Sequence, residues 1–331
     1  MENYTPSPNR YADGVMNYRQ CGNSGIKLPE LTLGFWWNYG EDNDYADCLA
    51  RMTHAFDNGI TCFDLANNYG PPFGAAETCF GRMYAENFKT HRHEMIITTK
   101  AGYNMWEGPY GCGSSRKMLI TSLDESLRRM KLDYVDIFYS HRYDGFTPIE
   151  ETMQALIDIV RSGKALYVGL SNYPADKLLA AVAYLRNQHV NPLIYQGKYN
   201  MLVRDVEERH FDALSNLGIG FTAFSPLAQG ILSGKYSDGI PDDSRAARLN
   251  PRMQEMLTAD VLKKVQRLAM IAESRGQTLA QMAVAWILAK QIVTSVIVGS
   301  RTIEQLADSI GAVHSSNFTP EELLEINQIL L

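Results

Sequence analysis

The sequence has no long apolar run, no basic cluster and no N-terminal leader pattern, and each absence excludes a class of protein. No apolar stretch approaches the roughly 20 residues of a membrane-spanning helix, so no membrane partner is expected. The 31 Lys and Arg residues are outnumbered by 37 Asp and Glu, for a net charge of -6. This balance argues against a nucleic-acid partner. Residues 1–14 are polar and contain prolines, unlike a signal or transit peptide, so a cytoplasmic protein is expected.

Cysteines are few and carry no pattern. There are five, an odd number, and they are scattered without the spacing of a metal site: Cys21, Cys48, Cys62, Cys79 and Cys112. An odd, scattered set is typical of free thiols in a reducing compartment. The sequence therefore predicts neither disulfides nor a bound metal.

The nucleotide-binding fingerprints of the common folds are also missing. The glycines of Gly108-Pro109-Tyr110-Gly111-Cys112-Gly113 are in the wrong order for G-x-G-x-x-G and do not directly follow an expected strand. No G-x-x-x-x-G-K-[ST] occurs either. Any nucleotide must therefore be held by other means.

Short apolar segments alternate with amphipathic ones along nearly the whole chain. The expected strands are 31–36, 60–64, 95–100, 134–140, 165–171, 192–196, 220–224 and 294–298. The expected helices are 44–58, 77–86, 115–131 (capped by Ser114 or Ser115), 149–161, 175–187, 206–216, 260–275, 279–289, 303–313 and 321–331.

Eight such βα units with no linker between halves predict an α/β protein, a single (β/α)8 TIM barrel domain over residues 1–331. The predicted domain also contains extra C-terminal helices and a long loop at 225–257, after the seventh strand. An open doubly wound sheet is the alternative, but it would need the missing fingerprint.

Reactive side chains follow the expected strands at one end. In a barrel the carboxyl ends of all strands share one face. Those ends carry Trp36, Asp64 followed by the loop residue Tyr69, Lys100 and His141. Because the second, third and fourth strands are neighbours, Asp64, Lys100 and His141 are expected to converge around Tyr69.

These residue types suit proton transfer to a carbonyl. A tyrosine ionises near pH 10, and an ammonium beside it is expected to lower that pKa, while a carboxylate holds the ammonium in place. A neutral imidazole can orient a carbonyl by hydrogen bonding. Tyr69 would then protonate a carbonyl oxygen as a hydride reaches the carbon.

Each residue also has an ordinary interpretation. Lys100 could be a solvated charge, His141 a turn residue, and Asp64 with Lys100 a structural salt bridge. A different chemistry is open as well, in which Lys100 forms a Schiff base in a lyase or isomerase. Four suitable residues at three adjacent strand ends favour the proton-transfer hypothesis.

No side chain can supply a hydride, so a redox cofactor is required. Ser171, Asn172 and Gln196 have groups suited to a carboxamide, and Phe224 could stack on a flat ring or belong to the core. The loop 225–230 offers backbone groups to a pyrophosphate. The N-terminus of helix 303–313 favours a phosphate. Lys235, Arg245 and Arg301 are separated cations whose ordinary role would be solvated surface.

Together these motifs resemble the aldo-keto reductase family over nearly the whole chain. The resemblance rests on Phe63-Asp64-x-Ala66-x-x-Tyr69-Gly70, Thr99-Lys100, Tyr139-Ser140-His141, Gly169-x-Ser171-Asn172, Gln196 and Ser225-Pro226-Leu227. Within the family, Asn67 to Pro72, Tyr110-Gly111, Ser114 to Lys117 and Ser233 to Tyr236 are similar to one branch. That branch holds bacterial L-glyceraldehyde 3-phosphate reductase and the β subunits of voltage-gated potassium channels.

The resemblance implies NADPH as cofactor and the tetrad Asp64, Tyr69, Lys100 and His141, with Tyr69 as the acid. It implies cofactor contacts from Trp36, Asp64, Ser171, Asn172, Gln196, Phe224, Ser225, Pro226, Leu227, Gly230, Lys235, Arg245, Gly299, Ser300, Arg301, Gln305, Asp308 and Ser309. Two departures concern the last segment: Asp308-Ser309 stands where relatives have Glu-Asn, and the basic residue is displaced to Arg301. The branch also suggests a homo-tetramer or homo-octamer.

The expected function is therefore NADPH-dependent reduction of small aldehydes or ketones. Trp36, Tyr69, Trp106 and His141 would line the substrate pocket, and Arg142 could attract an anionic group. Methylglyoxal and glyceraldehyde 3-phosphate are candidate substrates. The alternative is a regulatory subunit that binds NADPH, senses redox state and turns over little.

Overall fold

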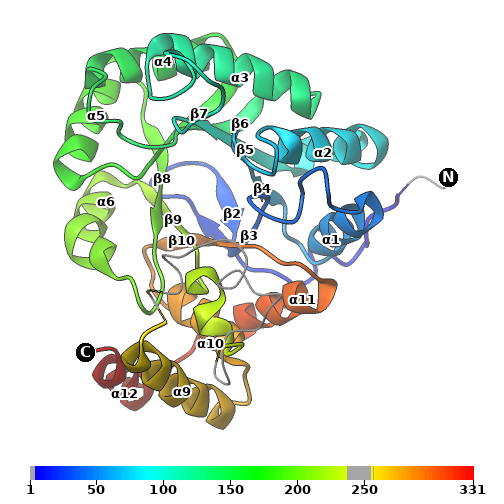
Figure 1. Ribbon diagram of the computed structural model, residues 1–331, viewed down its shortest axis with the longest axis vertical. Helices are drawn as coiled ribbons and strands as arrows, with labels where there is room; N and C mark the ends of the chain where they lie inside the picture. The colour runs from blue at the N-terminus through cyan, green and yellow to red at the C-terminus, as the bar shows by residue number, and fades with distance from the viewer. Residues whose placement is uncertain (1–3, 237–254, 256) are drawn as a thin grey trace.

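Eight parallel strands close into a barrel in the computed structural model of the protein, which describes residues 4–236, 255 and 257–331. The strands follow one another around the barrel in chain order, and β10 closes it against β3 (Figure 1). They are β3 (Leu31–Gly34), β4 (Cys62–Asp64), β5 (Ile96–Ala101), β6 (Val135–Ser140), β7 (Ala165–Ser171), β8 (Pro192–Lys198), β9 (Gly220–Phe224) and β10 (Val293–Val298). The predicted (β/α)8 barrel is confirmed, and the open sheet is excluded.

Helices surround the strands and end close to their predicted bounds (Figure 1). They are α1 (Tyr45–Asp57), α2 (Ala75–Met83), α3 (Arg116–Met130), α4 (Ile149–Arg161), α5 (Ala175–Asn187), α6 (Asp212–Leu217), α9 (Ala259–Ser274), α10 (Leu279–Leu288), α11 (Ile303–Gly311) and α12 (Pro320–Leu330). The cap of α3 is Ser115, whose hydroxyl accepts from the Met118 amide. The helix predicted at 77–86 begins two residues earlier and continues into a π-helical turn at 84–88.

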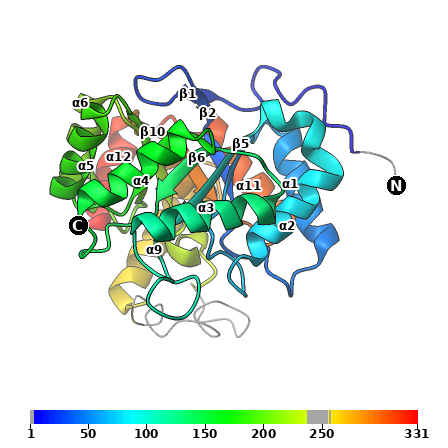
Figure 2. The same ribbon diagram turned by 90° about the horizontal axis from the view of Figure 1, so that it is seen from above.

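The expected polar lead-in contains a β-hairpin that the sequence pattern did not indicate. Strands β1 (Tyr18–Gln20) and β2 (Lys27–Pro29) pair antiparallel, and Figure 2 shows them at one end of the barrel. Cys21 and Leu28 of this hairpin pack on barrel residues that include Ile137 and Ile194. Three-residue strands are too short to show the alternation by which strands are recognised. The hairpin covers one end and leaves the opposite end for the site.

The register of the strands brings the predicted site residues to one level. Asp64 of β4 lies opposite Thr98 of β5, and Lys100 lies opposite Tyr139 of β6. Asp64, Lys100 and His141 therefore leave three adjacent strands at the same end of the barrel.

All five cysteines are free, as predicted. Among the helices of the described residues, none has the length and apolarity required to cross a membrane. The assignment of residues 1–331 to one domain stays a prediction.

Candidate active site

Lys100 is the centre of the site. Its side chain is fully buried, and its ammonium donates to Asp64 Oδ2 at 2.7 Å, to the Leu65 carbonyl at 2.6 Å and to the Tyr69 hydroxyl oxygen at 3.2 Å. The tight turn after β4 positions Tyr69, whose amide donates to the Ala66 carbonyl. Lys100 is therefore not the solvated charge of the ordinary interpretation.

Asp64 is held from three sides. Its Oδ1 accepts from the Thr98 hydroxyl and from the Gln196 amide, both at 2.9 Å, while Oδ2 accepts from Lys100. The carboxylate is 3% exposed, so this ion pair lies almost out of water. The structural salt bridge considered from the sequence is real, and it is the same bridge that holds Lys100 against Tyr69. Gln196, predicted to hold the cofactor, already orients Asp64.

The phenol of Tyr69 holds its proton firmly. Burial, the Asp64 charge and nearby Tyr103 raise its pKa well above 10. The expectation that the ammonium lowers this pKa is wrong for the structure, because desolvation outweighs the attraction. Burial also lowers the pKa of Lys100, against the opposing effect of Asp64. Tyr69 is thus protonated at neutral pH, as an acid must be.

His141 lies beside Tyr69 as a neutral base. The two ring centroids are 6.0 Å apart at an interplanar angle of 71°, and His141 is 7% exposed. Burial, Lys100 and Arg142 lower its pKa well below 6.5. His141 is therefore a buried site residue and not a surface turn residue.

Because the pKa of His141 is lowered, kcat/KM is expected not to fall as the pH decreases toward 6.5. A base with a depressed folded pKa stays neutral until the pH falls through that folded value, so kcat/KM should be unchanged between about pH 7.5 and 6.5. The unfolded chain takes up the proton near pH 6.5, so the contribution of His141 to stability should decline below that pH. Steady-state rates and acid unfolding test the two statements. An acid limb centred near pH 6.5 in kcat/KM would contradict the assignment.

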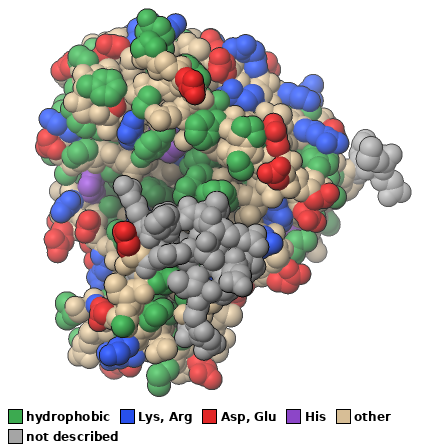
Figure 3. All heavy atoms as spheres, in the orientation of Figure 1, with side chains coloured by type: hydrophobic (Ala, Val, Ile, Leu, Met, Phe, Trp, Pro, Cys, Tyr) green, Lys and Arg blue, Asp and Glu red, His purple; other side chains and the backbone are tan. Residues whose placement is uncertain are grey.

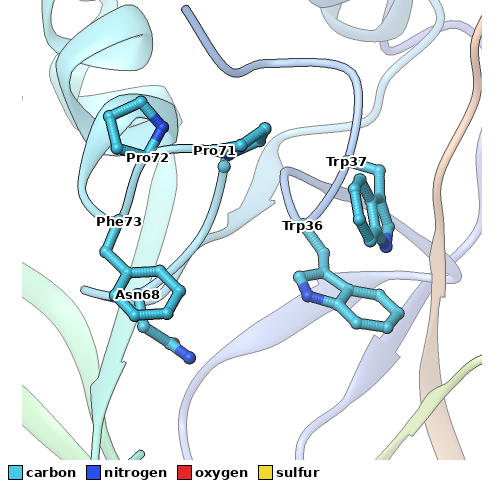
Figure 4. Close-up of a pocket in the computed structure, with 7 residues that line it drawn as sticks. Trp36, Trp37, Asn68, Pro71, Pro72 and Phe73 are labelled. Atoms are coloured by element: carbon cyan, nitrogen blue, oxygen red, sulfur yellow. The ribbon is translucent and has the colours of Figure 1, made fainter. Parts of the chain in front are cut away.

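A pocket of about 440 Å³ is lined by the loop after β3 and by the turn after β4, including Asn68 and Gly70 on either side of Tyr69 in the chain. Figure 4 shows Trp36 and Trp37 on one side, facing Asn68, Pro71, Pro72 and Phe73 on the other. Hydrophobic side chains also gather around a hollow in the face drawn in Figure 3. The lining of the pocket is mainly aromatic and apolar.

The lining agrees only in part with the predicted substrate residues. Of the predicted substrate residues, Trp36 lines the pocket, whereas the other four are not among the described lining residues: Tyr69, Trp106, His141 and Arg142. Trp37 and Phe73 do line it and were not predicted. Trp37 directly follows Trp36, and Phe73 directly follows the Gly-Pro-Pro turn. These positions could have indicated that both residues line the pocket.

The predicted nicotinamide contacts lie at the same end of the barrel. Ser171 ends β7 and Phe224 ends β9. Asn172 donates to the His141 carbonyl at 3.1 Å and to the Ser171 hydroxyl at 3.0 Å. Phe224 is partly exposed, which suits a stacking surface better than a core residue.

The segment after β9 has an unusual backbone. Ser225, Ala228 and Gln229 have positive φ values of 56°, 47° and 60°, a conformation that costs energy in non-glycine residues and concentrates at ligand sites. The segment also contains Pro226, Leu227, Gly230 and the exposed Lys235. The prediction for Arg245 lies outside the described residues.

The segment at 299–309 suits a phosphate. Ser300 is 3% exposed, and its hydroxyl has no partner among the described residues. It precedes the nine-residue helix α11, whose N-terminus attracts anions. An orphaned buried hydroxyl at that position fits a cofactor phosphate.

The other predicted residues of this segment make contacts within the protein. The Arg301 amide donates to Gln305 Oε1 at 2.9 Å, and Gly299 leads into the segment from β10. Asp308 accepts from the Thr278 hydroxyl at 2.7 Å, and Ser309 donates to the Gln305 carbonyl at 3.0 Å. Asp308 and Ser309 thus stabilise α11 whether or not they contact a cofactor.

Arg142 is turned toward the loop after β5. Its Nε donates to the Gly102 carbonyl and its Nη2 to Cys112 Sγ, both at 3.0 Å. Its guanidinium carbon lies 4.7 Å from the Tyr103 ring centroid. These contacts favour a role in holding the loop over the predicted attraction of an anionic substrate.

Comparison of the sequence with known proteins identifies one family. The Aldo/keto reductase family pattern covers residues 30–331. L-glyceraldehyde 3-phosphate reductase of Escherichia coli is 50% identical over 327 residues, covering 97% of this chain and 94% of the relative. A probable voltage-gated potassium channel subunit beta of Arabidopsis thaliana is 38% identical over 321 residues, covering 95% and 97%. A putative one of Schizosaccharomyces pombe is 36% identical over 323 residues, covering 95% and 93%.

Proposed function

The chain belongs to the aldo/keto reductase family of oxidoreductases, and on that premise we propose that it reduces small aldehydes and ketones with NADPH, using Tyr69 as the general acid. The observation that supports this most directly is the buried Lys100 ammonium, which donates to both Asp64 and the Tyr69 hydroxyl. The orphaned Ser300 hydroxyl supports NADPH as the cofactor.

Each residue of the tetrad has a separate role in the proposed reaction. When bound, NADPH supplies the hydride that reaches the carbonyl carbon. Tyr69 donates its proton to the carbonyl oxygen, which completes the alcohol. Lys100 stabilises the phenolate left behind, and Asp64 keeps the ammonium in place. Neutral His141 orients the carbonyl by a hydrogen bond.

The substrate is proposed to be compact. The aromatic lining of Trp36, Trp37 and Phe73 suits small or flat carbonyl compounds. The name of the bacterial relative adds glyceraldehyde 3-phosphate as a candidate, and methylglyoxal is a second. A homo-tetramer or homo-octamer remains part of the proposal.

The deciding experiment follows NADPH oxidation with a panel of carbonyls: methylglyoxal, glyceraldehyde 3-phosphate, 4-nitrobenzaldehyde and short ketones. Turnover with at least one of them is expected, and the ranking identifies the substrate class. Tight NADPH binding without turnover would instead favour the regulatory function suggested by the potassium channel relatives. Borohydride trapping of substrate on Lys100 would favour Schiff-base chemistry.

NADPH is expected to be preferred over NADH through Lys235, Arg245 and Arg301. Arg301 precedes Thr302, the N-cap residue of α11, and its carbonyl accepts from Arg51 at 3.0 Å. The change Arg301→Ala should raise KM for NADPH by about tenfold or more, since a hydrogen bond to a charged group contributes roughly 1.5–3 kcal/mol, and should leave KM for NADH unchanged. Equal kcat/KM for the two cofactors in the unaltered protein would refute the preference.

A further inference from the structure

Within the part of the chain that the structure describes, the imidazole of His141 lacks the hydrogen bond that usually fixes a functional histidine. Its Nδ1 is buried and has no partner among the described residues. In most sites the second ring nitrogen donates to a carbonyl or carboxylate, which sets the tautomer and the ring orientation. The orientation of His141 must therefore come from packing.

Tyr103 supplies the closest aromatic packing on this imidazole. The Tyr103 and His141 ring centroids are 4.6 Å apart at 88°, nearer than the 6.0 Å to Tyr69. A Cβ at Gly102 would lie 3.2 Å from His141 Cβ, so the backbone before Tyr103 runs directly against the histidine. The His141 amide donates to the Ala101 carbonyl at 2.9 Å. An edge-to-face arrangement of two aromatic rings at such a distance is energetically favoured, so the Tyr103 ring stabilises one orientation of the imidazole.

Arg142 holds Tyr103 in turn. Its guanidinium lies over the Tyr103 ring at 4.7 Å and bonds to Gly102 O and Cys112 Sγ at the two ends of the same loop. A guanidinium stacked on a ring and fixed by two acceptors is a rigid support. The same positive charge faces His141 together with Lys100, while Tyr69 and Tyr103 are the other titratable groups beside the ring.

We propose that Tyr103 and Arg142 form a clamp: the Tyr103 ring fixes the orientation of the His141 imidazole for carbonyl binding, and the Arg142 guanidinium holds Tyr103 and places a positive charge beside the imidazole. Both are positioning residues and neither is assigned a step in proton transfer. This inference rests on the proposed reductase function, because it concerns the orientation of a group that acts in that reaction. It also gives Arg142 a role different from that of an anion receptor.

Two substitutions at Tyr103 test the packing. Tyr103→Leu should lower kcat by about 10- to 100-fold, the scale of a misplaced catalytic group, with little change in the Kd for NADPH. Tyr103→Phe keeps the ring and should retain the activity of the unaltered protein. Tyr143→Leu is the matched control, because Tyr143 packs on Tyr173 in the following loop. Normal kcat in Tyr103→Leu, or equal losses in the Leu and Phe variants, would overturn the clamp.

The substitution Arg142→Met tests whether the Arg142 charge disfavours protonation of His141, and the test does not depend on activity. Removing the guanidinium should raise the pKa of His141, measured by ¹⁵N NMR with His141→Gln as the assignment sample, and Arg142→Lys should preserve most of the effect. An unchanged His141 titration in Arg142→Met would overturn this part. If no carbonyl is turned over but the His141 resonances shift in Tyr103→Leu and Arg142→Met, the clamp stands and the proposed function fails. If turnover occurs and neither variant affects the His141 resonances, the proposed function stands and the clamp fails.

Discussion

Replacing Tyr69 with phenylalanine is expected to lower kcat/KM for carbonyl reduction by about 10²- to 10⁴-fold, the range that general acids contribute. The substitution removes one oxygen, which accepts from Lys100 at 3.2 Å and carries the proton that the reaction consumes. Because its pKa is raised, this phenol is protonated at neutral pH and is a competent donor. The ring that packs beside His141 is retained.

The measurement is the steady-state rate with the best carbonyl of the panel, together with NADPH binding by fluorescence. Binding should stay within about twofold, because a group that acts only in the transition state leaves ground-state affinity unchanged. Tyr110→Phe is the matched control, since Tyr110 is 60% exposed on the loop after β5. Undiminished turnover in Tyr69→Phe would refute the assigned acid.

Replacing Lys100 with methionine is expected to abolish turnover and to destabilise the fold by about 3–5 kcal/mol, the usual consequence of removing one partner of a buried ion pair. The ammonium is fully buried, and Asp64 is nearly so. Once Lys100 is gone, the donors to the Asp64 carboxylate that remain among the described residues are the neutral groups of Thr98 and Gln196. Denaturant unfolding measures the loss of stability, and the carbonyl assay measures the loss of turnover.

The double variant Lys100→Met with Asp64→Asn separates the two effects. Removing both charges should recover part of the stability, because no uncompensated buried charge remains. Activity should not return, since nothing then stabilises the Tyr69 phenolate. A single Lys100→Met variant as stable as the unaltered protein would show that the pair is not desolvated. A fully active one would exclude Lys100 from the mechanism.

Much of the fold could be predicted from the sequence, because the patterns that indicate strands and helices lie within each element. Hydrophobic runs, capping residues such as Ser115 and glycines after helices predicted the strands and helices of the barrel within a few residues. The hairpin β1–β2 was missed, because its strands are three residues long and its cover of the barrel end is a long-range contact.

For the site, the order of the strands was enough to predict that Asp64, Lys100 and His141 lie together. Asp64, Lys100 and His141 end or follow consecutive parallel strands, and the closure of such strands brings their ends to one face whatever the side chains do. Tyr69 follows on the next turn. The convergence of Asp64, Lys100 and His141 thus follows from the order of the strands, whereas the position of Tyr69 depends on the turn after β4.

The protonation and the contacts of these residues depend on neighbours that the sequence pattern does not reveal. The pKa of Tyr69 is raised where its lysine neighbour predicted a decrease, because desolvation depends on every surrounding atom. Gln196 turns to Asp64, Arg142 turns to Tyr103, and Trp37 and Phe73 complete the pocket. Side-chain direction, burial and electric field arise from neighbours far apart in the chain, so no local pattern contains them.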